Sequence, residues 1–149
     1  MAISLIPNAL KKTTTIYLII DDTLQAKFGE KFDCYEKLFD HISKNGSSYF
    51  NGHCFVSLAI AIPIIHNAKI NYLKLPIQYR LYDKSKTKLE VAADMVIDVA
   101  HVLAEYQVII TCDSWYTKTQ FISSIKKNEN INIIGALRSV AIQICLRLI

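Results

Sequence analysis

The stretch YLIIDDTLQAKFG, from Tyr17 to Gly29, decides how this sequence is interpreted. The residues from Thr15 to Ile20 are β-branched, aromatic or aliphatic, which is typical of a strand covered on both faces of a sheet. That apolar run stops abruptly at two adjacent carboxylates, Asp21 and Asp22. A carboxylate at the end of a buried strand is costly unless a partner compensates its charge. The stretch therefore predicts a strand over residues 15–20 that places an acidic side chain in a binding or catalytic site at its end.

A second stretch, VIITCDSWY, repeats the pattern. A short β-branched strand over 107–112 is followed at once by Asp113. Ligand sites in open α/β sheets lie at the carboxyl ends of the strands, and two carboxylates there would suit Mg²⁺ or Mn²⁺. Aspartates after strands also cap a following turn or helix, and both interpretations stay open. One of Asp21 and Asp22 is expected to have only that second role.

The other elements complete an α/β order. Strands are expected over 53–64, 72–82 and 131–137. Residues 28–48 are ambiguous, either a short helix or a loop, and turn signals stand at Asn45-Gly46 and Asn51-Gly52. The resulting order is three strands, a helix, a strand, a helix and a strand, which predicts a mixed sheet with helices.

The clearest helix begins near Thr87, which has capping-box spacing to Glu90. Thr117 and Gln120 repeat that spacing and predict the start of a second helix. In the first helix, apolar residues recur at helical spacing and a polar stripe, expected to face solvent, lies opposite them. The apolar positions are Leu89, Ala92, Val96, Val99 and Leu103, and the polar ones are Asp94, Asp98, His101 and Glu105.

Composition excludes several classes of protein. The 149 residues fit one domain, and the apolar run over 54–65 is shorter than the roughly 20 residues that span a bilayer. The start of the chain does not have the pattern of a signal peptide, so we expect a cytoplasmic protein with no membrane partner. The net charge of +4 permits a nucleic-acid partner without requiring one. The four cysteines form no CxxC pair and the histidines no helical zinc pair, which favours reduced core cysteines and no zinc site.

Four pieces of the chain, in order, resemble the catalytic domain of insertion-sequence DDE transposases. They are IIDDTLQAKFG, NGSSYFNGHCFVSLAIAI, LPIQYRLYDK, and VIITCDSWYTKTQFISSIKKN with INIIGALR. The IDDT…K and CDSWY…F pieces are the most specific. The resemblance implies a ribonuclease H-like mixed sheet flanked by helices, incomplete at the C-terminus. It divides the chain into a remnant of an N-terminal region (1–14), a partial catalytic domain (15–138) and a divergent tail (139–149).

The resemblance also implies a reaction, which is metal-dependent hydrolysis of a phosphodiester at a transposon end followed by attack of the freed 3′-hydroxyl on target DNA. The first catalytic acid is placed at Asp21, with Asp22 as its rival, and the second at Asp113. These acids would hold Mg²⁺ or Mn²⁺. Double-stranded DNA would be the partner of a nucleoid-associated protein. Its expected contacts are Lys27, Lys126, Lys127 and Arg138.

Several of these residues have a plainer interpretation. Lys27 is equally an ordinary surface lysine, and Lys126 and Lys127 also suit the negative pole at a helix end. Trp115 and Tyr116 could stack on bases, but core packing is favoured for both.

The sequence departs from the family where a third acid is needed. The family carries a glutamate on a helix after the last strand, but no Asp or Glu follows Glu129 here. We therefore expect a truncated chain that is inactive or nearly so as encoded. The alternative is a non-enzymatic remnant that binds DNA, forms a homo-oligomer or pairs with a full-length transposase.

Two other acid-using classes fit less well. A phospho-acceptor receiver domain would need a much shorter separation between its acids than that from Asp22 to Asp113. A haloacid-dehalogenase-type phosphatase spaces its first two aspartates by one residue, whereas Asp21 and Asp22 are adjacent.

Overall fold

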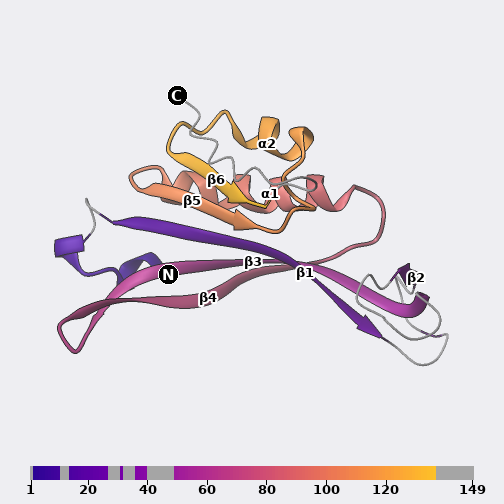
Figure 1. The fold of residues 1–149 in the computed structure, drawn as a ribbon, viewed down its shortest axis with the longest axis horizontal. Helices are drawn as coiled ribbons and strands as arrows, with labels where there is room; N and C mark the ends of the chain where they lie inside the picture. The colour runs from indigo at the N-terminus through magenta and orange to yellow at the C-terminus, as the bar shows by residue number, and fades with distance from the viewer. Residues whose placement is uncertain (1, 11–13, 27–30, 32–35, 40–48, 137–149) are drawn as a thin grey trace.

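The computed structural model of the protein describes residues 2–10, 14–26, 31, 36–39 and 49–136. Figure 1 shows two helices gathered beside β5 and β6, with the long strands of the sheet extending past them. The strands are β1 (Thr15–Ala26), β2 (Glu36–Phe39), β3 (Tyr49–His66), β4 (Lys69–Leu81), β5 (Gln107–Cys112) and β6 (Ile131–Gly135). The helices are α1 (Lys88–Ala100) and α2 (Thr119–Ile125), with short 3₁₀ turns η1 (Ala2–Leu5), η2 (Asn8–Leu10) and η3 (His101–Leu103).

The six strands of the described chain belong to one mixed sheet in the order β2-β3-β1-β5-β6, with β4 also paired to β3. β1 is antiparallel to β3 and parallel to β5, while β6 is parallel to β5. α1 links β4 to β5 and α2 links β5 to β6, as parallel strands require a crossover. The prediction of an α/β domain with a mixed sheet is therefore confirmed.

Strand register gathers the core on one face of the sheet. In β1 the buried residues alternate with less buried ones, and Leu18 and Ile20 lie opposite the buried Ile60 and Leu58 of β3. α1 contacts both β3 and α2, and its buried side chains complete the same core. Full burial of an aliphatic side chain contributes roughly 1.5–3 kcal/mol, so this face supplies most of the stability. The largest fully buried side chains include Ile16, Leu18, Leu58, Ile62, Met95, Val96, Ile110, Tyr116, Phe121 and Ile125.

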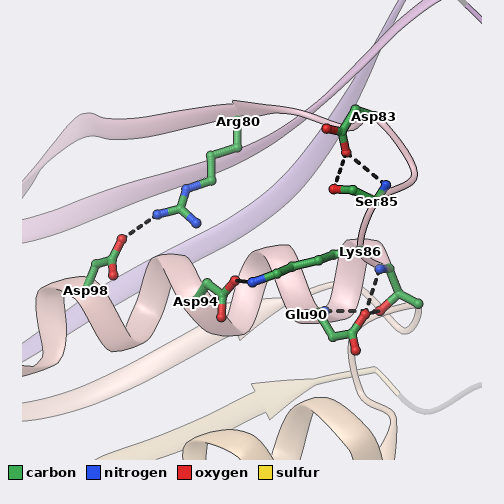
Figure 2. A network of polar contacts seen from close by, with 8 residues as sticks. Arg80, Asp83, Ser85, Lys86, Glu90, Asp94 and Asp98 are labelled. Carbon is green, nitrogen blue, oxygen red and sulfur yellow. Dashed lines mark hydrogen bonds and ion pairs between the residues drawn. The ribbon is translucent and has the colours of Figure 1, made fainter. Parts of the chain in front are cut away.

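The predicted capping box of α1 is confirmed. The Thr87 hydroxyl accepts a hydrogen bond from the Glu90 amide at 3.2 Å, and the Glu90 carboxylate accepts one from the Thr87 amide at 2.7 Å. The polar stripe also faces solvent as expected. Figure 2 shows Asp98 paired with Arg80 of β4, and Asp94 paired with Lys86 at 2.6 Å.

β4 contains one irregularity in its pairing with β3. Leu58 lies opposite Gln78, but the next residue of β3, Ala59, lies opposite Pro76. Ile77 is therefore the extra residue of a β-bulge, which is a position where a strand tolerates a proline nearby.

Two predictions about β1 and β3 are wrong. β1 does not end at Ile20 but continues through both aspartates to Ala26, because β3 pairs with it along that whole length. Asn51-Gly52 is not a turn but part of β3. A Cβ atom at position 52 would lie 2.2 Å from the carbonyl oxygen of Gln25, so the glycine allows β1 to approach closely. The other turn signal, Asn45-Gly46, lies outside the described residues.

Two further predictions need correction. Within the region expected to be helix or loop, the described residues 36–39 form strand β2, paired with β3. The second capping box is absent, because α2 has Lys118 at its N-cap without a side-chain hydrogen bond. The Thr117 hydroxyl donates instead to the carbonyl oxygens of Ser114 at 3.0 Å and Ala136 at 2.8 Å.

No helix in the described part of the chain is long and apolar enough to cross a membrane. Cys54 and Cys112 are free thiols, the first buried and the second half-buried, as core cysteines should be. Cys34 and Cys145 lie outside the described residues.

Candidate functional site

The two aspartates of β1 point to opposite faces of the sheet, because side chains alternate along a strand. Asp22 is half-buried and lies on the same face of β1 as the buried Leu18 and Ile20. Asp21 is exposed on the other face, and its Oδ1 accepts a hydrogen bond from the adjacent amide of Asp22 at 2.9 Å. Of the two rivals, Asp22 is therefore the one directed toward the helices.

Asp22 is surrounded by side chains from three other parts of the fold. The Lys88 ammonium, in the first turn of α1, donates to Asp22 Oδ2 at 2.5 Å. The Cys54 thiol of β3 lies 3.7 Å from the same oxygen, and the Tyr116 hydroxyl, in the segment after β5, donates to Oδ1 at 3.5 Å. Among the described residues, the site is thus one carboxylate held by one cation and two weak neutral donors.

The charge states in this cluster follow from burial and from the ion pair. Burial alone would lower the pKa of Lys88, but the hydrogen bond and the charge of Asp22 outweigh it, so that the pKa is raised. Burial is the main cause that raises the pKa of the Cys54 thiol and, much further, that of the Tyr116 phenol. Lys88 therefore stays protonated while both neighbours stay neutral. None of these three groups is a nucleophile or a general base near neutral pH.

Asp113 has a different environment. It is exposed, and its Oδ1 accepts a hydrogen bond from the Trp115 amide at 2.7 Å, while its carbonyl oxygen accepts one from the Tyr116 amide at 3.2 Å. The aspartate thus stabilises the turn that follows β5, which is the plainer of its two expected roles. That turn carries the Tyr116 side chain to Asp22.

The acids of β1 and β5 lie in one region of the molecule. Ile20 and Cys112 are register partners, so the residues that follow them leave the parallel pair side by side. The negative charges of Asp22, Asp113 and Asp21 all contribute to the raised pKa of Tyr116, although burial contributes most. Of these carboxylates, the one in contact with the Tyr116 hydroxyl is Asp22, whose Oδ1 lies 3.5 Å away.

These carboxylates do not fit a ready site for a divalent cation. Within the described ranges, no group of three or more His, Cys, Asp and Glu side chains could hold a metal ion. Asp22 Oδ2 is already bonded to Lys88, and Asp113 Oδ1 to its own turn. A cation of charge +2 would either bind beside the Lys88 ammonium, which has like charge, or displace it from Asp22.

Of the residues expected to contact DNA, Lys126 and Lys127 are exposed at the end of α2. Lys27 and Arg138 lie outside the described residues. Tyr116 is fully buried and its ring packs edge-on against Phe121 with centroids 6.1 Å apart, so its predicted core packing is confirmed.

Trp115 is half-buried and packs against the core as well. The ammonium of Lys118 lies 3.9 Å from the centroid of its ring, which is a cation–π contact.

Lys88 makes the closest contact to Asp22 but was not predicted from the sequence. One local signal points to it. A lysine in the first turn of a helix lies at the positive end of the helix dipole, which is unfavourable without a compensating acid. The partner itself is not visible in the sequence, because it lies 66 residues away.

Comparisons of the chain with protein-family models, with curated proteins and with solved structures find no match. Function must therefore be argued from the site and not from the fold alone.

Proposed function

We propose that this chain is a transposase-family domain with a ribonuclease H-like fold, which binds double-stranded DNA but does not cleave it as encoded. The observation that carries the proposal is the parallel register of β1 and β5, in which Ile20 pairs with Cys112, so that acids follow this pair on both segments of the chain. The element order supports it, since long strands, helix, strand, helix and strand follow one another as in the family, with β2 as an additional short strand.

Within this proposal, the first acid is Asp22 and the second is Asp113. Asp22 is favoured over Asp21 because its side chain is half-buried on the core face, whereas Asp21 is exposed on the other. The family reaction requires carboxylates that hold divalent metal. The proposal of an inactive site rests on the ion pair between Asp22 and Lys88, which occupies the carboxylate.

DNA binding would be electrostatic. Lys126 and Lys127 are exposed cations that follow α2, and phosphate contacts of this kind give binding that weakens as salt rises.

The test uses the purified chain and a fluorescent DNA duplex. We expect anisotropy to report binding whose affinity falls with salt, and we expect the double variant Lys126→Ala and Lys127→Ala to reduce the salt slope by about 1–2. Lys69→Ala with Lys74→Ala, two exposed lysines of β4, is the matched control and should leave the slope unchanged.

The same preparation is then incubated with supercoiled plasmid and Mg²⁺ or Mn²⁺. We expect no nicking above the level of Asp22→Asn. Absence of DNA binding would contradict the DNA-binding part of the proposal. Metal-dependent nicking that Asp22→Asn abolishes would contradict the proposal that the chain does not cleave DNA.

A second candidate function is pairing with a full-length transposase. It is favoured by apolar side chains that the β3–β4 hairpin leaves exposed, namely Ile65 at 53% and Ile70 at 56%. These two residues are register partners, so they form one small patch. Mixing the chain with a full-length transposase should shift its sedimentation coefficient, and Ile65→Lys with Ile70→Lys should prevent the shift.

A further inference from the structure

We propose that Lys88 excludes divalent cations from Asp22 in this chain, because its ammonium supplies the positive charge that a metal ion would otherwise bring. The inference rests on the proposed function for the role of Asp22. Its test measures metal binding and does not depend on DNA.

The ammonium of Lys88 lies directly against the Asp22 carboxylate, where little water reaches the pair. Lys88 Nζ lies 2.5 Å from Asp22 Oδ2, and the two side chains are only 21% and 20% exposed. The neighbouring pair of Lys86 and Asp94 is 56% and 36% exposed. Two charges attract each other more strongly where water is largely excluded. The ion pair of Lys88 with Asp22 is therefore harder to separate than that of Lys86 with Asp94.

Lys88 is held in place by the start of α1 and by an aromatic neighbour. The residue follows Thr87, whose capping box fixes the first turn of α1. Its ammonium also lies 5.6 Å from the centroid of the Tyr82 ring. The backbone of Lys88 is therefore fixed, and its side chain cannot rotate into solvent without losing the contacts of its ammonium with Asp22 and the Tyr82 ring.

The negative charge of Asp22 already has a positive partner. Among the described residues, the titratable groups that face Asp22 are the cation Lys88 and the neutral Cys54 and Tyr116, so the carboxylate is already compensated. A divalent cation would either sit next to an ammonium of like charge or displace it. If the lysine is replaced by an uncharged residue, Asp22 becomes a carboxylate without a compensating cation, and Mg²⁺ or Mn²⁺ commonly binds through one or two carboxylates and water.

The experiment measures Mn²⁺ binding to the full chain by the loss of the free-ion electron paramagnetic resonance signal, with calorimetry as a second readout. We expect Lys88→Met to bind Mn²⁺ at least about tenfold more tightly than the unaltered chain, because removing a like charge favours the ion. Lys86→Met is the matched control and should bind as the unaltered chain does. The double variant Lys88→Met with Asp22→Asn should lose the gain.

Equal Mn²⁺ affinity in the unaltered chain and in Lys88→Met would overturn the inference, as would a gain that survives Asp22→Asn. If Lys88→Met does not fold, Lys88→Gln keeps a hydrogen-bond donor without the charge. The unaltered chain gives a test of its own. If it binds Mn²⁺ and Asp22→Asn abolishes that binding, Lys88 does not exclude divalent cations from Asp22. If Lys88→Met gains Mn²⁺ binding but the unaltered chain does not bind DNA, the inference about Lys88 stands and only the proposed function is contradicted.

Discussion

The acids that follow the apolar runs of β1 and β5 are held in opposite ways. β1 continues past Asp22 because β3 pairs with it as far as Ala26, whereas β5 ends at Cys112 and the chain turns at Asp113. An acid inside a strand cannot bond to the amides of a turn, so Asp22 takes its partners from α1, β3 and the segment after β5. Asp113 is satisfied by the amide of Trp115. Two similar sequence patterns thus lead to a long-range site and to a local turn.

Removing the side chain that connects these two regions should have the largest effect. Tyr116 is fully buried between them, so Tyr116→Ala should lower the free energy of unfolding by about 3–5 kcal/mol. Tyr116→Phe keeps the ring and loses one long hydrogen bond, and it should cost about 1 kcal/mol or less. Urea unfolding followed by circular dichroism measures both. Similar losses for the two variants would mean that the hydroxyl, and not the ring, connects the regions.

The next largest effect separates the two aspartates of β1. Asp22→Ala leaves the ammonium of Lys88 mostly buried without its partner and should cost about 2 kcal/mol. Asp21→Ala removes an exposed carboxylate and should change stability by less than about 0.5 kcal/mol. The same unfolding experiment compares them. A larger loss for Asp21→Ala would reverse our assignment of the inward-facing acid.

The turn after β5 should be less sensitive. Asp113→Ala removes one hydrogen bond to the Trp115 amide and should cost about 1 kcal/mol. Asp113→Asn retains an acceptor oxygen and is the matched control, which should stay within a few tenths of the unaltered chain. If both variants lower the free energy of unfolding equally, the charge of Asp113 stabilises the protein more than its hydrogen bond to the Trp115 amide does.

The smallest effect is expected at the outer side of α1. Lys86→Ala breaks an exposed ion pair with Asp94, and it should leave the unfolding midpoint unchanged within error (Figure 2). Lys88→Ala, two residues further on, should shift the midpoint clearly toward lower urea. Equal shifts would show that exposure does not distinguish the two pairs.

Local signals in the sequence predicted much of the fold. The capping box at Thr87 and Glu90 and the apolar runs of β1 and β5 depend on neighbouring residues only, and the structure contains all of them. The length of β1 depends on its pairing with β3, which is distant in sequence, and so the end of the strand was placed too early. The second capping box failed because Thr117 hydrogen-bonds to Ala136, which lies beyond α2.

The candidate site was also predictable only where it depends on local sequence signals. The sequence indicated which apolar runs end in acids, and in the structure the last residues before those acids, Ile20 and Cys112, are register partners. It could not distinguish Asp21 from Asp22, because the choice depends on which face of β1 the helices cover. Nor could it reveal Lys88 as a partner, since that contact requires α1 to pack across the sheet.

The bulge at Ile77 changes the phase of β4. Before it, Leu73 and Leu75 pair with Ile62 and Ile60 and face the core, so odd-numbered positions point inward. After it, Arg80 pairs with the buried Val56, so even-numbered positions point inward. One inserted residue thereby turns Arg80 toward Asp98 of α1 and leaves Tyr79 on the opposite face, 65% exposed. Because the pairing shifts by one residue, the inward-facing positions of β4 change from odd to even numbers. The same strand therefore presents apolar side chains to the core at one end and a charged side chain to α1 at the other.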